Sequence, residues 1–422
     1  MIPAVYRTLL RDRRTRRLLA GLGVSSLGDG MSVVTIAWLA VRIAPAGELG
    51  TFVGLALAAY TLPGVIGALA FGRFVRHRPA RALVLVHCLL RAGFLGVIAL
   101  LWAFDALTPL AYVPLLAGSS LMAAWGNAGE YTMLSELGGP DGRLAVNSLA
   151  SAQVSFAVIV GPALAGPLIA WIGPGWLVAL DAASFAFLGI QAWRTHTGAS
   201  AADQPVDTHA AESGFRLLRR RRDLLALTAV TWVFFFLYGP VEAALPVYIA
   251  RDLHADAGLL GAYWTAFGVG ALAATLIVGT LRGHDVRRIT VWIVAGWGAS
   301  LIPFGFAPVG VTVACFALGG LIYGPFIPLT YSVFQSATTT ANLPAVLAAR
   351  SALVMVSTPL GTAIGGPLVG ALGASETLAA SGVATVALAI AASIVWRQGR
   401  PAAGSATARL RGNEGIGDRL SG

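Results

Sequence analysis

Apolar runs long enough to cross a bilayer recur along the whole chain, and they constrain its fold more than any other feature. A membrane-spanning helix needs about 20 consecutive, mostly apolar residues. Only 11% of the residues are charged, too few for the polar exterior of a soluble fold of this length. The sequence therefore predicts an all-α polytopic membrane protein. The expected spans lie at 18–43, 50–72, 81–104, 109–133, 144–172, 175–193, 224–250, 257–281, 288–307, 309–335, 345–373 and 376–396.

A polar segment divides these twelve spans into two sets of six. The predicted organisation is an N-terminal tail at 1–17, a six-helix bundle at 18–193, a central loop at 194–223, a second bundle at 224–396 and a C-terminal tail at 397–422. The N-terminal tail is rich in arginine but is followed by no small-residue cleavage site, so it is not expected to be a signal peptide.

The basic residues predict the orientation in the membrane. All 29 are arginines, and all but four fall in the tails or in alternate loops on one side. The exceptions are Arg42 and Arg251 on the other side, and Arg91 and Arg350 inside spans. Basic loops face the cytoplasm, so both termini are expected in the cytoplasm. The protein itself is expected in the inner or plasma membrane. The net charge of +10 thus indicates a bilayer partner and no nucleic acid.

The two halves carry an internal repeat. At an offset of 200 residues, Gly161, Gly166 and Pro167 match Gly361, Gly366 and Pro367. A weaker match at an offset of 207 pairs Gly54 with Gly261, Gly72 with Gly279 and Arg81 with Arg288. Duplicated membrane halves place a binding site near the midplane between them. We expect Gly161 and Gly361 to make tight contacts across the two halves.

Charged residues inside spans mark the candidate site, because a charge in hydrocarbon costs about 2.5 kcal/mol or more. Asp29, Arg91 and Asp181 fall near mid-bilayer, and Glu242 lies nearer the outer end of its span, where it is expected to meet substrate or water at the outer mouth or to snorkel at the interface. Asp29, Arg91 and Asp181 form either a structural ion network or a site at which one acid exchanges a proton. Asp29 is the favoured proton carrier, and Arg91 is its expected partner.

Local sequence around these charges adds two expectations. Gly28 and Gly30 are expected to leave space for substrate or water beside the Asp29 carboxylate. His87, one turn before Arg91, is either a packing residue or a proton relay.

Several short motifs resemble the major facilitator superfamily, and more narrowly its drug:proton antiporter group, which includes the enterobactin exporter and macrolide efflux proteins. They are Leu27-Gly28-Asp29-Gly30, Asp181 to Phe185, Phe215 to Arg219, and Leu245 to Tyr248. The resemblance runs from Leu18 to Trp396. It implies two pseudo-symmetric six-helix bundles, alternating access, and export of a small drug-like, macrolide-like or siderophore-like molecule by proton antiport.

Two further motifs bear on the resemblance to that group. Gly161-Pro162-Ala163-Leu164-Ala165-Gly166 resembles its antiporter motif, with Ala165 replacing one glycine, and Gly361, Gly366 and Pro367 are the second-half counterparts. These residues are expected to let helices pack closely and bend. The loop after the second span keeps the basic residues Arg73, Arg76 and Arg78 but has Gly72 where the group has aspartate. That departure puts the group's cytoplasmic latch in doubt.

Aromatic residues in the seventh and eighth spans, among them Trp232, Phe235, Tyr238 and Trp264, are candidates for an apolar pocket.

The sequence also leaves other functions open. A facilitator or importer without proton coupling is the main alternative, and an enzyme or receptor is a remote one. No hydrolase, metalloprotease or ATP-binding motif occurs, so no enzyme activity and no cofactor are expected. Cys88 and Cys315 give neither a disulfide framework nor a metal site, and the chain is expected to act as a monomer.

Overall fold

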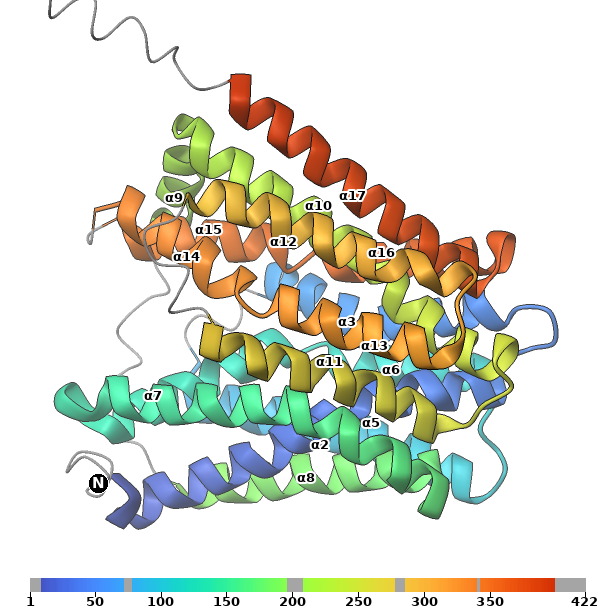
Figure 1. Cartoon of the computed structure of the whole chain (residues 1–422). Coiled ribbons are helices and arrows are strands. Elements are labelled where there is room, and N and C mark those ends of the chain that lie inside the picture. Colours follow the sequence, from blue (N-terminus) through green and yellow to red (C-terminus); the bar gives the residue numbers. More distant parts are fainter. Residues whose placement is uncertain (1–8, 72–77, 196–207, 278–284, 340–341, 399–422) are drawn as a thin grey trace, which may run out of the picture.

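The computed structural model describes residues 9–71, 78–195, 208–277, 285–339 and 342–398, and these form a bundle of helices (Figure 1). In this part of the chain, ten helices or helix pairs are long and apolar enough to cross a membrane. The prediction of an all-α membrane protein is confirmed. The α-helices are α2 (Arg13–Ile43), α3 (Leu49–Ala70), α5 (Ala80–Ala103), α6 (Pro109–Ser120), α7 (Ala123–Ile172), α8 (Pro174–Arg194), α9 (Thr208–Arg220), α10 (Arg222–Val247), α11 (Ala257–Ile277), α12 (Val286–Leu301), α13 (Val309–Tyr323), α14 (Phe326–Ala337), α15 (Leu343–Val354), α16 (Ser357–Leu372) and α17 (Ala374–Gln398).

The two expected spans that are not among the ten consist of shorter helical pieces. The span expected at 109–133 is built from α6 and the first part of α7. The span expected at 288–307 is built from the 16-residue α12 and a 3-10 turn at Ile302–Gly305. A continuous helix of about 20 residues was therefore the wrong expectation for both, although the apolar runs were identified.

A single glycine separates the helices that the sequence placed at 109–133 and 144–172. Gly139 has φ 60° and ψ −173°, a backbone conformation open essentially only to glycine, and helix resumes directly after it. The connection expected between these spans is thus mostly helical, and α7 runs through it with one break.

The central loop contains a helix that the sequence analysis did not predict. One face of α9 packs on the second set of spans, where Leu218 is buried with Leu224, Phe334 and Val346. A Cβ at Gly214 would collide with the backbone of Ala345 in α15, so α9 lies close against that helix. Arg216, Arg219 and Arg220 are exposed on the opposite face.

Helices α2 to α8 form the N-terminal half, and α10 to α17 form the C-terminal half. The most extensive packing across this division is that of α3 on α16 and α10, and of α11 on α7. In Figure 1, α11 lies along α7, and α3 lies among helices of the C-terminal half. The start of α2, α9 and the end of α17 all lie toward the left side of Figure 1, from bottom to top. We call this side of the molecule the terminal end and the other side the opposite end.

Pairs of glycines join the two halves at the opposite end. A Cβ added at Gly54 would lie 2.5 Å from the Cα of Gly366, and one added at Gly261 would lie 2.9 Å from the Cα of Gly166. The repeat relates these pairs, since Gly54 corresponds to Gly261 and Gly366 corresponds to Gly166. Without side chains, the backbones of α3 and α16, and of α11 and α7, approach closely.

The expected contacts of Gly161 and Gly361 across the halves are wrong. Gly161 packs on Gly30 of α2, where a Cβ would lie 2.7 Å from the Gly30 Cα, and Gly361 packs on Gly239 of α10 at 3.2 Å. Both contacts lie within one half. Along α7 and α16, the two motif glycines are five residues apart and therefore point to different neighbouring helices.

Candidate functional site

A cavity of about 550 Å³ lies between the two halves, and its walls differ in chemistry. The N-terminal half contributes mainly aliphatic and polar side chains from α2 and α7: Leu22, Ser25, Ser26, Asp29, Val33, Asn127, Glu130, Tyr131, Val154, Val158, Ile159 and Pro162, with Phe185 from α8. The C-terminal half contributes mainly aromatic side chains: Phe234, Phe235, Tyr238, Trp264, Phe267 and Tyr323, together with Glu242. The volume and apolar lining are those of a small-molecule site.

The glycine contacts close this cavity at the opposite end. Pro162 and Trp264 line the cavity, and Gly166 and Gly261 meet about one helical turn beyond them. Among the lining residues, Tyr131 is 37% exposed, whereas Leu22, Ser25 and Glu130 are buried. The contact of Gly166 with Gly261 thus bounds the cavity toward the opposite end.

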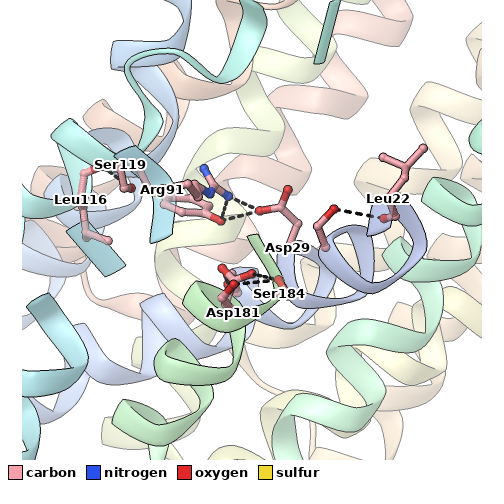
Figure 2. Close-up of polar contacts among 10 residues, drawn as sticks. Leu22, Asp29, Arg91, Leu116, Ser119, Asp181 and Ser184 are labelled. Atoms are coloured by element: carbon pink, nitrogen blue, oxygen red, sulfur yellow. Dashed lines mark hydrogen bonds and ion pairs between the residues drawn. The ribbon is translucent and has the colours of Figure 1, made fainter. Parts of the chain in front are cut away.

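Asp29 faces the cavity from the middle of α2, and its partner is Arg91 of α5 (Figure 2). One Nη of Arg91 donates to Asp29 Oδ1 and also to the hydroxyl of Tyr60, which itself donates to Asp29 Oδ1 at 3.0 Å. The predicted pairing of Asp29 with Arg91 is therefore found in the structure. The Asp29 side chain remains 46% exposed, whereas that of Arg91 is 6% exposed.

Aromatic rings surround the buried guanidinium of Arg91. Its Cζ lies 4.5 Å from the ring centre of Tyr60 and 4.9 Å from that of Phe185. These cation–π contacts and the ion pair compensate for the removal of the charge from water. Arg91 is thus fixed in the wall, and Asp29 is the partner that the cavity reaches.

Asp181 lies behind Asp29 and outside the cavity lining. It is 1% exposed, and its carboxylate accepts hydrogen bonds from Ser32 at 2.5 Å and from Ser184 at 3.3 Å. No arginine or histidine of the described residues lies within 4.0 Å of it as an ion-pair partner. The three-charge network anticipated from the sequence is therefore an ion pair with a separately held acid beside it.

The glycines on either side of Asp29 both pack against neighbouring helices, and Gly30 also lines the cavity beside the carboxylate as expected, whereas Gly28 does not. A Cβ at Gly28 would collide with Asp181 and Ser184 of α8, and one at Gly30 would collide with the backbone of Ala157 in α7. Their small size lets α2 sit close to both neighbours.

Glu242 projects into the same cavity from α10, so it belongs with Asp29 and not to a separate outer mouth. Its Oε2 accepts a hydrogen bond from Thr362 at 3.2 Å. Glu130 is a third acid in the lining and is 5% exposed. His87 packs edge-on against Phe185 and against Gly126, away from the cavity lining.

The remaining predicted site residues are spread over the molecule. Gly72, Arg73 and Arg76 of the loop motif lie outside the described residues, and Arg78 is exposed. Among the described residues, no three His, Cys, Asp or Glu side chains gather as a metal site would require. Cys88 and Cys315 are both free.

Tyr60, Glu130 and Tyr323 belong to the site, but they were not predicted from the sequence. Tyr60 lies near the middle of α3, so the depth argument that singled out Arg91 would also have selected it. Tyr323 ends α13 in a predicted span, where nothing distinguishes it from an interfacial aromatic residue.

The chain matches the transmembrane secretion effector family across residues 9–409. The chain belongs to this family of the major facilitator superfamily. It is therefore a multi-pass membrane transporter and not an enzyme, and the resemblance drawn from the motifs is confirmed at the level of the superfamily.

Relatives and solved structures agree with this assignment. The multidrug efflux pump Tap of Mycolicibacterium fortuitum is 28% identical over 382 residues, which cover 86% of this chain and 91% of Tap. The nucleoside transporter NupG superposes with a TM-score of 0.69 at 14% identity, over 91% of this chain and 99% of NupG. A bacterial homologue of the iron transporter ferroportin, in an inward-facing state, superposes with a TM-score of 0.69 at 15% identity, over 90% and 98% of the two chains.

Proposed function

We propose that this transporter exports small amphipathic molecules from the cytoplasm in exchange for protons, by alternating access. The observation that carries the proposal is the Asp29–Arg91 pair, whose acid faces a cavity between two halves that are joined at one end. The relationship to the Tap multidrug efflux pump supports export of drug-like molecules.

The proton step follows from the geometry of the pair. As a carboxylate, Asp29 accepts from Arg91 and Tyr60; protonation would remove the charge that Arg91 compensates and weaken both contacts. Binding of a proton then favours whichever conformation depends less on this pair. Because Asp29 is open to the cavity, substrate and proton would reach it by the same route.

The charge distribution supports the direction of transport. With both termini in the cytoplasm, as the arginine distribution predicts, the glycine contacts would lie on the outer side, and we infer that the cavity opens to the cytoplasm. The inward-facing ferroportin homologue has a similar fold. One chain encloses the whole cavity, which supports a monomer in the plasma or inner membrane.

Reconstituted vesicles provide the test. Purified protein is placed in liposomes, and fluxes of a panel of amphipathic dyes, a macrolide and a catecholate siderophore are measured with and without a pH gradient. We expect at least one compound to accumulate against its gradient when the proton gradient is imposed, and a protonophore to abolish this accumulation. Flux that only dissipates substrate gradients, with no response to pH, would identify a facilitator and overturn the coupling.

A further inference from the structure

The aromatic wall of the cavity is one continuous cluster. Tyr323 lies 5.7 Å from Phe267 and 6.4 Å from Phe235, measured between ring centres, and Phe267 lies 6.0 Å from Trp264. Trp297, which is buried, packs behind the cluster, 5.5 Å from Phe267. The rings are thus supported by their neighbours, and several of them face the cavity.

Glu242 is the acid of this wall, and its charge is not compensated as that of Asp29 is. Asp29 contacts the guanidinium of Arg91, whereas the hydrogen bond described for the Glu242 carboxylate comes from the neutral hydroxyl of Thr362. In the described part of the chain, no arginine or histidine lies within ion-pair distance of Glu242. A carboxylate in an apolar cavity is stabilised by a cation, and here the described residues supply none.

We propose that Glu242 and the neighbouring rings of Tyr238, Tyr323 and Trp264 form the recognition site for an organic cation: a protonated amine or onium group on an apolar body. A carboxylate and aromatic faces both attract such a group, while the aliphatic wall opposite accepts its apolar part. The inference rests on the proposed function in assuming that the cavity holds substrate, and it separates two tasks. Glu242 recognises the charge of the substrate, and Asp29 with Arg91 serves coupling.

Binding of two ions of similar shape and opposite charge tests this assignment. Tetraphenylphosphonium and tetraphenylborate are titrated against the full chain in nanodiscs of zwitterionic lipid, with protein-free nanodiscs subtracted. We expect saturable, tryptophan-quenching binding of the phosphonium and at least tenfold weaker binding of the borate. Glu242→Gln should weaken phosphonium binding at least tenfold, and Glu242→Asp should restore most of it.

Matched variants test whether weakened phosphonium binding is specific to the loss of the Glu242 charge. Glu48→Gln removes an exposed acid at the start of α3 and should leave phosphonium binding unchanged. Tyr323→Leu keeps the carboxylate but removes a ring, and should weaken binding several-fold, which provides a second variant if Glu242→Gln does not remain monodisperse.

Three results would overturn the inference: tighter binding of the borate, unchanged phosphonium binding in both Glu242→Gln and Tyr323→Leu, or loss of phosphonium selectivity in Glu130→Gln instead of Glu242→Gln. The assay uses no gradient, so it is independent of coupling. Weakened binding in Glu242→Gln without any pH-driven flux in the parent would support this site while refuting coupled export. Coupled export of uncharged compounds alone, with no phosphonium binding, would support coupled export while refuting this cation site.

Discussion

At the scale of single residues, the acids in and beside the cavity are held in different ways. Asp29 is paired with a cation and reachable, Asp181 is buried and held by serine hydroxyls, and Glu242 is reachable and without a cation among the described residues. The manner in which each carboxylate is bonded determines what its replacement should change.

Replacement of Asp29 by asparagine should abolish coupling. Asn keeps the size and can still accept from Tyr60, but it cannot exchange a proton or carry the charge that Arg91 compensates. In the vesicle assay we expect Asp29→Asn to lose pH-driven accumulation while downhill flux and membrane levels persist. Asp105→Asn is the control, since Asp105 is exposed and its φ of 50° suits asparagine. Accumulation at the parental rate with the same pH dependence would move the proton role to Asp181.

Removal of the Ser32 hydroxyl should reduce stability and leave coupling intact. Ser32 donates at 2.5 Å to the buried Asp181 carboxylate, and a hydrogen bond to a charged group contributes about 1.5–3 kcal/mol. We therefore expect Ser32→Ala to lower the thermal unfolding midpoint in detergent by several degrees. Ser148→Ala, which removes an exposed hydroxyl bonded within its own helix, should have little effect. Lost coupling without lost stability would show that Asp181 belongs to the transport machinery.

Depth along a helix is readable from sequence, but the neighbours of a side chain are not. Counting residues from the flanking arginines placed Asp29 and Arg91 at the same depth in the bilayer, and the two side chains are in contact in the structure. The same count put Asp181 at that level, yet Ser32 and Ser184 hold it instead of Arg91. Which helix faces which side chain depends on rotations about helix axes, and apolar runs in lipid leave these rotations undefined.

At the scale of helices, each of the motif glycines has one partner helix, and this determines what a larger side chain would disrupt. Gly366 meets α3 of the other half, whereas Gly361 meets α10 of its own half. A bulky residue should therefore separate the halves at the first position and loosen one half at the second.

Leucine substitutions test this distinction. Gly366→Leu should leave each half folded and the protein in the membrane, but prevent closure of the opposite end, so transport should fall at least tenfold. Gly361→Leu should instead lower the unfolding temperature and the amount of protein in the membrane. Flux, unfolding and membrane levels are measured for both variants and for Gly310→Leu, where a Cβ meets no neighbour. Parental flux in Gly366→Leu would remove the glycine contact from the mechanism.

The spans were predictable because the bilayer imposes their length and composition, whereas their breaks depend on local backbone chemistry. The expected bounds 81–104 and 175–193 differ from α5 and α8 by one residue at each end. The interruptions at Gly139 and between α13 and α14 fall at glycine–proline steps inside helical or apolar stretches. Helix α9 was missed because it is too polar for a span and gains its stability by docking.

At the scale of the whole molecule, alternating access requires the two halves to separate where they now touch. Thr51 of α3 and Gly370 of α16 lie on opposite sides of this contact, and a Cβ at Gly370 would lie 3.2 Å from Thr51 Oγ1. A cysteine pair at these positions is close enough for a disulfide between the halves.

This disulfide should stop transport reversibly. In a background without Cys88 and Cys315, we expect Thr51→Cys with Gly370→Cys to crosslink under mild oxidation, to lose flux, and to recover it on reduction. The control keeps Cys88 and adds Gly189→Cys, where a Cβ would lie 3.1 Å from the Cys88 Cβ within the N-terminal half. That crosslink should leave flux intact. Full flux in the crosslinked Thr51–Gly370 variant would exclude opening at this contact.

The proposed direction of export depends on orientation, which labelling decides. In a cysteine-free background, a membrane-impermeant maleimide should label Ala46→Cys, in an opposite-end loop, on intact cells. Ser405→Cys, in the C-terminal tail, should react only after permeabilisation. Labelling of Ser405→Cys on intact cells would invert the orientation and make the cavity open outward.

The paired glycine contacts also bear on how such a chain arose. Gly54 on Gly366 and Gly261 on Gly166 are one contact made twice, related by the internal repeat. An interface in which the same two patches meet reciprocally is the isologous arrangement of two-fold symmetric dimers. A gene encoding one six-helix unit would already specify both surfaces of the seal, and two copies of its product would close on each other. Fusion of two such genes would preserve the interface and leave each half free to acquire its own cavity wall, aliphatic in one and aromatic in the other.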